Sequence, residues 1–173
     1  RPHLVEMTKR DDNPNAAAIE ATLDDAFTER SLAITAYEMK WPYEQYVAAH
    51  GALIEQRVHD RMAQARAITP ARYESLLADK HAVRARVREL AGDGDGIIML
   101  ASSGPAPAGL GHTGSRTFLT QATFLGFPAF SLPLLEADGM PLGLQVMGWS
   151  GADNRLCAMA RWMMQGAGAP WCQ

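Results

Sequence analysis

The stretch 128–148, PAFSLPLLEADGMPLGLQVMG, restricts the fold of this chain more than any other part of the sequence. Two runs of strand-forming residues flank Asp138-Gly139, a dipeptide that favours tight hairpin turns. In the second run, a period of two is typical of a strand: Leu142, Leu144 and Val146 alternate with Gly143, Gln145 and Met147. The stretch therefore predicts an antiparallel β-hairpin.

A strand, a loop and a short helix are predicted before this hairpin, and a final helix after it. Asp95-Gly96 forms a turn that leads into a short buried strand, Ile97 to Ala101. The final helix carries a Met-rich stripe at helical spacing, which favours core packing over cofactor binding; its members are Leu156, Met159, Ala160 and Met163. Residues 93–173 are therefore expected to form a strand–loop–helix–hairpin–helix segment of an α/β fold.

Residues 1–92 are expected to be mainly helical. Asn13-Pro14 marks a helix start and Gly92 a helix end. Between them we expect an apolar connector, SLAITAYEMKWPY, which is interrupted at Pro42. Two long helices follow, over residues 43–65 and 70–90, and are expected to pair as an antiparallel hairpin. The segments 1–92 and 93–173 are expected to belong to one structural unit.

Charge and cysteine content exclude several classes of function. A net charge of −3 over 173 residues provides no basic surface for nucleic acid or an anionic membrane. Cys157 and Cys172 cannot build a disulfide framework, which favours a cytoplasmic protein with reduced thiols. No apolar run approaches the ~20 residues of a membrane-spanning helix. We therefore expect neither nucleic acid nor a membrane among the partners.

Gly109, Gly111 and Gly114 form a GxGxxG pattern, which binds dinucleotides when a strand runs straight into its first glycine. Here the predicted strand ends near Ala101, and a gap that contains two prolines follows. The next predicted strand contains Pro133, which cannot donate to a central ladder, and it leads into an antiparallel turn. The glycines are therefore expected to shape a loop, and nucleotide binding is only a third alternative.

Ser102-Ser103-Gly104 follows a predicted strand, as a nucleophile on a strand-to-helix turn would, but the G-x-S-x-G pattern is absent. The histidines are dispersed, and only His112 lies in the loop-rich second half. The two serines are expected to be turn or capping residues, although a triad that folding assembles stays open. No pair of His or Cys has metal-ligand spacing, so no metal site is expected.

The motifs of the second half occur in a distinctive order. Asp95-Gly96 is followed by SSGPAPAG, Thr113-Gly114, GFPAFSLP, GMPLGLQVMG and DNRLCAMARWMM. This order resembles the C-terminal part of the amidase signature family, including its blocks G-x-P-A-x-x-x-P and G-x-P-x-G-x-Q-x-x-G. Thr123 stands where many members carry Asn. The resemblance is specific over residues 95–164 and loose over the helical residues before them.

The resemblance implies hydrolysis of a carboxamide by a Ser–cis-Ser–Lys triad. In that mechanism the lysine relays a proton through one serine to activate the other, and backbone amides stabilise the oxyanion. These residues belong to the family's N-terminal half and have no match here, so no catalytic residue is expected in this chain. Ser102 and Ser103 lie in the wrong block for that role. No cofactor and no metal are implied.

The resemblance also places the Gly-rich loop beside the substrate pocket. The candidate substrate-binding residues are Ser103, His112, Thr113, Gly114 and Thr117. The implied fold is the C-terminal part of a mixed β-sheet flanked by helices. The expected partners are the missing N-terminal half, on the same or another chain, and a small-molecule amide; a homo-oligomer stays open. The alternative function is a non-catalytic scaffold or partner-binding subunit with the same architecture.

Overall fold

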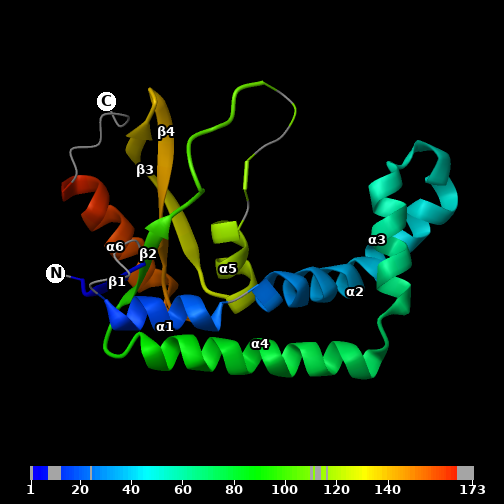
Figure 1. Cartoon of the computed structure of the whole chain (residues 1–173), viewed down its shortest axis with the longest axis horizontal. Coiled ribbons are helices and arrows are strands. Elements are labelled where there is room, and N and C mark those ends of the chain that lie inside the picture. Colours follow the sequence, from blue (N-terminus) through cyan, green and yellow to red (C-terminus); the bar gives the residue numbers. More distant parts are fainter. Residues whose placement is uncertain are drawn as a thin grey trace. The chain divides into compact units, whose positions relative to one another are not determined.

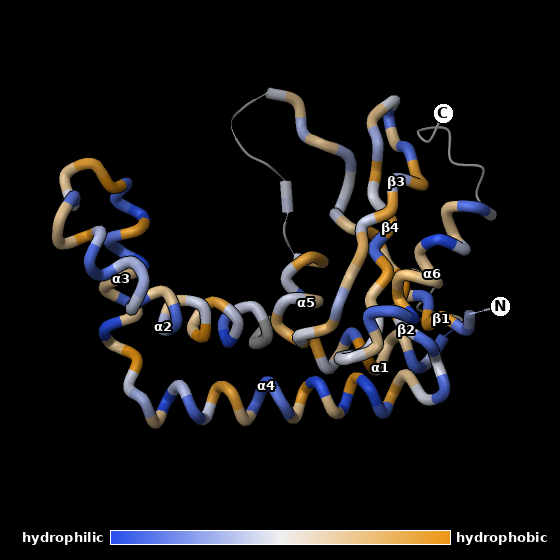
Figure 2. The backbone as a smooth tube through the Cα atoms, turned by 180° about the vertical axis from the view of Figure 1, so that it is seen from behind, coloured by the Kyte–Doolittle hydropathy of each residue, from blue (hydrophilic) through white to orange (hydrophobic). Residues whose placement is uncertain are grey.

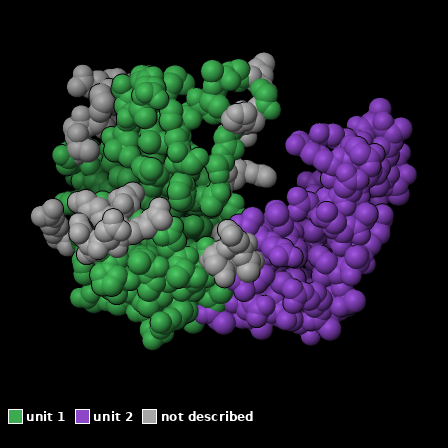
Figure 3. Space-filling model, in the orientation of Figure 1, with its two compact units in different colours: residues 1–23, 83–173 green, residues 24–82 purple. Residues whose placement is uncertain are grey.

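The computed structural model describes residues 2–7, 13–23, 25–109, 111, 114–115 and 117–166 (Figure 1). In chain order its elements are β1 (Leu4–Glu6), α1 (Pro14–Thr22), α2 (Asp25–His50), the 3-10 helix η1 (Gly51–Leu53), α3 (Gln56–Ala67), α4 (Pro70–Leu90), β2 (Gly96–Leu100), α5 (Thr117–Leu125), β3 (Ala129–Ala137), β4 (Met140–Met147) and α6 (Asp153–Gly166). They divide into two compact units, residues 1–23 with 83–173, and residues 24–82 (Figure 3). The composition change near Gly92 lies inside the first unit.

The first unit is built on a mixed sheet with the strand order β1-β2-β4-β3. β1 pairs in parallel with β2, whereas β2 and β3 both pair antiparallel with β4. β3 and β4 are the predicted hairpin, and both residues of its turn, Asp138 and Gly139, have the positive φ that such a turn requires. The register shifts between Leu132 and Leu135, which places Pro133 at a bulge of an edge strand, where its missing N–H is tolerated.

Helix α6 covers one face of this sheet. Leu132 and Val146 of the hairpin pack there against Leu156, Met159 and Ala160. The methionines of the last helix therefore fill the core, as the sequence predicts.

The other face of the sheet is buried as well. Ile97 and Met147, which oppose each other on β2 and β4, are both fully buried on it. Gln145 is buried on the same face, and its Nε2 donates to the carbonyl of Phe118 in α5, at 3.1 Å. The hydrogen-bond partner that a glutamine needs in an apolar strand is thus the backbone of a covering helix.

Helix α1 begins where the sequence predicts. Asn13 caps it, since its Oδ1 accepts from the backbone N–H groups of Asn15 and Ala16, at 3.1 and 3.3 Å. Pro14 takes the first helical position, where no N–H is needed. Ile19 of this helix is fully buried.

The second unit contains the helical hairpin, but between α2 and α3 and not between the two helices expected. Its antiparallel packing joins Arg66 Nε to Glu44 Oε1 at 3.2 Å, and His59 Nε2 to the carbonyl of Gly51 at 2.9 Å. The continuous helix predicted over residues 43–65 is wrong, because η1 and the two residues after it interrupt it. The connector predicted over residues 31–43 is wrong too, because α2 runs through Pro42.

Contacts on the N-terminal side of Pro42 explain why α2 continues. Tyr37 stacks on Tyr73 of α4 with ring centroids 4.2 Å apart, and Tyr73 Oη donates to Glu38 Oε1 at 2.8 Å. That hydrogen bond, together with burial, raises the pKa of Tyr73. An interior proline costs a helix about 3 kcal/mol, a loss that packing of this kind offsets.

Along helix α4, hydrophobic residues recur between hydrophilic ones (Figure 2). Leu76 and Val87 are its fully buried positions.

Among the described helices, none is long and apolar enough to cross a membrane.

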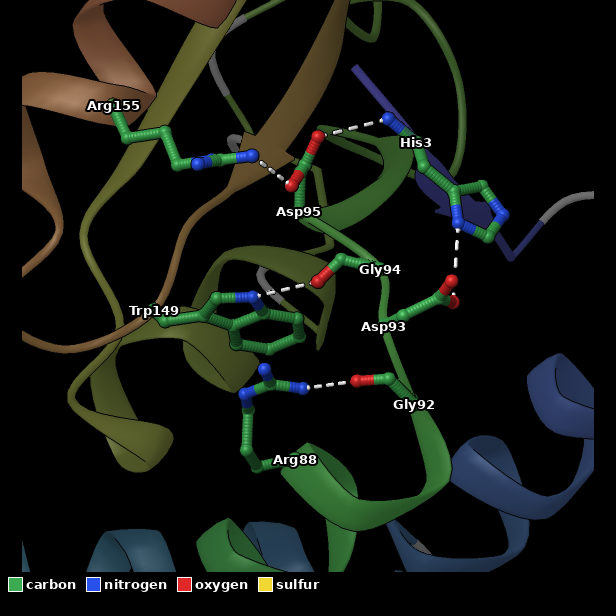
Figure 4. A network of polar contacts seen from close by, with 8 residues as sticks. All are labelled: His3, Arg88, Gly92, Asp93, Gly94, Asp95, Trp149 and Arg155. Carbon is green, nitrogen blue, oxygen red and sulfur yellow. Dashed lines mark hydrogen bonds and ion pairs between the residues drawn. The ribbon is translucent and has the colours of Figure 1, made fainter.

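A polar network ties β1 to the start of β2 (Figure 4). The backbone N–H of His3 donates to Asp95 Oδ2 at 3.0 Å, and Arg155 of α6 pairs with Asp95 Oδ1. The hydrogen bond from His3, followed by the guanidinium of Arg155, holds the pKa of Asp95 below its ordinary value. His3 Nδ1 also lies 3.3 Å from Asp93, which is almost fully exposed.

Trp149, after β4, extends this network toward α4. Its Nε1 donates to the carbonyl of Gly94 at 2.9 Å, and its ring packs edge-on against Phe127. The guanidinium of Arg88 lies over the same ring, 4.6 Å from the centroid, and donates to the carbonyl of Gly92 at 2.6 Å. Contacts from α4, from the turn before β2 and from the link between α5 and β3 therefore meet at one indole.

Replacing Asp95 with Asn should destabilise the chain by about 1–2 kcal/mol at pH 7, because hydrogen bonds to a charged acceptor are lost. A carboxyl whose pKa is lowered by folding stabilises above its unfolded pKa, near 3.8, and that stability disappears as the pH falls through the folded value. The difference between Asp95→Asn and wild type in urea unfolding should therefore shrink at pH 3. Asp93→Asn is the matched control, with an expected effect below ~0.5 kcal/mol. Equal effects at both pH values would contradict this assignment.

Candidate functional site

The segment between β2 and α5, drawn as a long loop in Figure 1, lines a partly open cavity of about 470 Å³. The described residues that line it come from this segment: Ser102, Ser103, Gly104, Pro105, Ala106, Pro107, Gly114 and Ser115. Proline and glycine make up six of the 16 residues 101–116, and in the described part of this segment the backbone turns without forming a helix or strand. The cavity therefore lies just beyond the end of β2.

The structure brings together part of the predicted substrate-binding set. Ser103 and Gly114 both line the cavity. Thr117 does not line it but connects to it, because its backbone N–H donates to Ser115 Oγ at 3.3 Å and its Oγ1 lies 2.9 Å from the same atom. His112 and Thr113 lie outside the described residues. Whether these residues bind a substrate stays a prediction.

Ser115 and the prolines of the segment were not among the predicted site residues. The SSGPAPAG motif did indicate a loop here, but which of its side chains face a shared space depends on how the segment folds back. Ser102 Oγ donates to the carbonyl of Gly104, which makes Ser102 a turn residue, as expected.

The described cavity wall offers hydroxyl and backbone groups and carries no ionisable side chain. Such a wall can orient an uncharged polar ligand by hydrogen bonds but supplies no general base of its own. In the described part of the chain, no three His, Cys, Asp or Glu side chains gather as a metal site would require.

The surroundings of the glycine pattern do not form a dinucleotide-binding unit. β2 and β3, the strands on either side of α5, are not neighbours in the sheet, because β4 lies between them and runs antiparallel to both. Gly109 and Gly114 have φ of 86° and 84°, values that favour glycine in a turning loop. The glycines therefore shape the cavity-forming segment.

Many solved structures match this fold, and three of them are described here. The crystal structure of an amidase matches with a TM-score of 0.73 and 25% identity, over 83% of this chain and 36% of that one. A chain from an unexpected vestigial protein complex, which concerns the evolutionary origins of an s-triazine catabolic enzyme, matches with a TM-score of 0.70 and 22% identity, over 97% of this chain and 43% of that one. A bacterial aryl acylamidase of the amidase signature family matches with a TM-score of 0.59 and 14% identity, over 78% of this chain and 32% of that one.

No protein-family model matches the sequence, and no curated protein matches it significantly. This chain spans well under half of the three solved chains, 36%, 43% and 32% of their respective lengths. The match to the amidase covers 83% of this chain, whose described part contains a mixed four-stranded sheet flanked by helices. The fold of this chain is therefore part of the amidase signature fold.

Proposed function

We propose that this chain is the C-terminal part of an amide hydrolase of the amidase signature type, to which it contributes fold and one wall of the substrate pocket. The observation that carries the proposal is the match to an amidase at 25% identity over 83% of the chain. The order of the sequence motifs from Asp95 to the last helix supports the C-terminal placement.

The reacting groups come from sequence outside this chain, either an upstream segment or another polypeptide. A Lys and two serines there would form the triad, and the proton path runs between them. The cavity wall of residues 102–107, 114 and 115 binds the part of the amide that does not react. Its neutral hydroxyl and backbone groups favour an uncharged acyl or amine portion.

A second candidate function is a non-catalytic subunit that binds a partner and keeps the architecture without the chemistry. It is favoured by the likeness to a chain of a protein complex described as vestigial. Both functions require a partner segment or chain, and they differ in whether the assembly turns over an amide.

The test compares this chain produced alone with the assembly purified from its native source. Release of ammonia or amine is measured on a series of aliphatic and aryl carboxamides. Turnover is expected only in an assembly that also contains the amidase half with the catalytic Lys and its Gly/Ser-rich stretch. An inactive assembly of that composition would favour the non-catalytic subunit. If the isolated chain were active, it would have to carry catalytic residues of its own, which would contradict the proposal.

A further inference from the structure

Helix α2 of the second unit exposes a row of large apolar side chains along one of its faces. Leu32 is 41% exposed, Tyr43 43% and Tyr46 63%, and Met39 between them is half-buried. Single exposed apolar residues are ordinary on a protein surface, whereas a continuous row of them marks an interaction site. These four residues are called the α2 seam below.

The α2 seam has the spacing of a coiled-coil contact. Leu32, Met39 and Tyr46 follow one another at intervals of seven residues. Tyr43 lies four residues after Met39 and three before Tyr46. Alternating steps of four and three keep side chains on one line of a helix, where each of them fits between side chains of a second helix. The seam therefore has the pattern that receives a partner helix.

The contacts that α2 makes within its own unit use a different face. Tyr37 stacks on Tyr73 of α4, and Glu44 accepts from Arg66 of α3. Tyr37 and Glu44 are seven residues apart, so they lie on one line of the helix. At 3.6 residues per turn, Tyr46 points away from both. The packing of the second unit thus leaves most of the seam uncovered.

The ends of the α2 seam are complementary to the same seam in reverse. The seam itself carries no charge, whereas Glu29 lies one turn before Leu32 and His50 one turn after Tyr46, and both are exposed. Two parallel copies would place Glu29 beside Glu29 and His50 beside His50. Two antiparallel copies instead place each carboxylate beside an imidazole, which donates a hydrogen bond to it.

We propose that α2 pairs antiparallel with α2 of a second copy of this chain, seam against seam. A two-fold axis requires that every contact occurs twice, and Met39 set opposite Tyr43 of the second copy meets this condition. It also places a thioether against an aromatic ring, which is a favourable contact. At a rise of 1.5 Å per residue, Glu29 then lies only about 4.5 Å along the axis from His50 of the second copy. Because the pairing involves the second unit alone, it does not depend on the proposed function.

The first test measures the mass of the natively purified assembly by sedimentation equilibrium, for wild type and two variants. Tyr46 and Trp41 are 63% and 62% exposed on the same helix, but Trp41 lies outside the seam. The wild-type assembly should contain two copies of this chain. Tyr46→Glu should raise the Kd between them at least ~100-fold, because two-fold symmetry buries the new charge twice, at ~10-fold each. Trp41→Glu should change it less than ~3-fold.

The second test examines the direction of pairing by exchanging the two polar ends. Glu29→Lys and His50→Glu should each raise the Kd between the copies about 5-fold, because each removes a favourable end contact on both sides of the axis. The double variant restores opposite partners, so its Kd should lie within about 2-fold of wild type. Urea unfolding of each variant separates weaker pairing from a less stable helix. A double variant that is as weak as the single ones would contradict antiparallel pairing.

The remaining outcomes decide whether a second copy occupies the seam. A wild-type assembly with one copy of this chain overturns the proposal, and so does a two-copy assembly that Tyr46→Glu leaves intact. If Tyr46→Glu releases the accompanying amidase half and not the second copy, the seam belongs to that half and the proposal is refuted. Each of these results leaves the proposed amide hydrolysis untouched, since turnover is measured separately.

Discussion

Deleting residues 109–114 from the complete enzyme will raise KM for its amide substrate by ~10-fold or more, or shift its substrate preference by as much. Gly114 is part of the cavity wall, and the deletion shortens the segment that holds Ser103 and Ser115 around the same space. A wall that contacts the substrate contributes binding energy, and a tenfold change in KM corresponds to ~1.4 kcal/mol of it. Steady-state kinetics on the best carboxamide substrate measure the effect.

A milder variant separates loss of the wall from loss of the fold. Gly104 lines the cavity, and a Cβ there would meet no atom within 4 Å, so Gly104→Phe fills the space without a clash at its base. It should raise KM in the same direction while the midpoint of urea unfolding stays unchanged. Unaltered kinetics in both variants would exclude this cavity from the substrate pocket.

Replacing Gly96 with Ala will destabilise the chain by about 3 kcal/mol or more. A Cβ at Gly96 would overlap the carbonyl oxygen of Met147, which is the β4 partner of the adjacent Ile97. That oxygen belongs to the ladder between two strands, so it cannot move without distorting the sheet, and overpacking of this kind costs one to several kcal/mol. Urea unfolding monitored by the fluorescence of the tryptophans gives the free energy.

Gly104→Ala is the matched control for this stability prediction. It introduces the same methyl group where no atom lies within 4 Å, so the expected change is within about 1 kcal/mol of zero. A Gly96→Ala variant as stable as this control would show that β2 and β4 do not approach each other as described.

Local sequence chemistry predicted the second half of the chain well, because its signals act over short distances. The turn residues Asp138 and Gly139 determine the hairpin by their backbone conformation. Asn13 and Pro14 likewise determine the start of α1. Such signals depend on the residues themselves and need no information about distant contacts.

The elements that sequence reasoning missed depend on tertiary contacts. β1 has only three residues and is stable because β2 lies beside it and Asp95 binds the N–H of His3. α2 passes through Pro42, a residue that ordinarily predicts a helix end, because contacts with α4 outweigh the lost hydrogen bond.

The candidate site was predictable only in outline. The Pro- and Gly-rich motifs after β2 indicated a loop, and Ser103 and Gly114 do share its cavity. The contribution of Ser115 could not be read from the sequence, because it follows from how the segment folds back on itself. The described part of the cavity wall carries no ionisable side chain, and hydroxyl and backbone groups leave little chemical signal in a sequence.

The most direct test of the central claim is intact-mass spectrometry of every polypeptide in the natively purified, amide-hydrolysing sample. We expect this sequence to be accompanied by the amidase half that carries the catalytic Lys and a Gly/Ser-rich stretch. That half should lie either in a second chain or in a single polypeptide much heavier than 18.8 kDa. A sample that contains only an 18.8 kDa species and still hydrolyses an amide would contradict it.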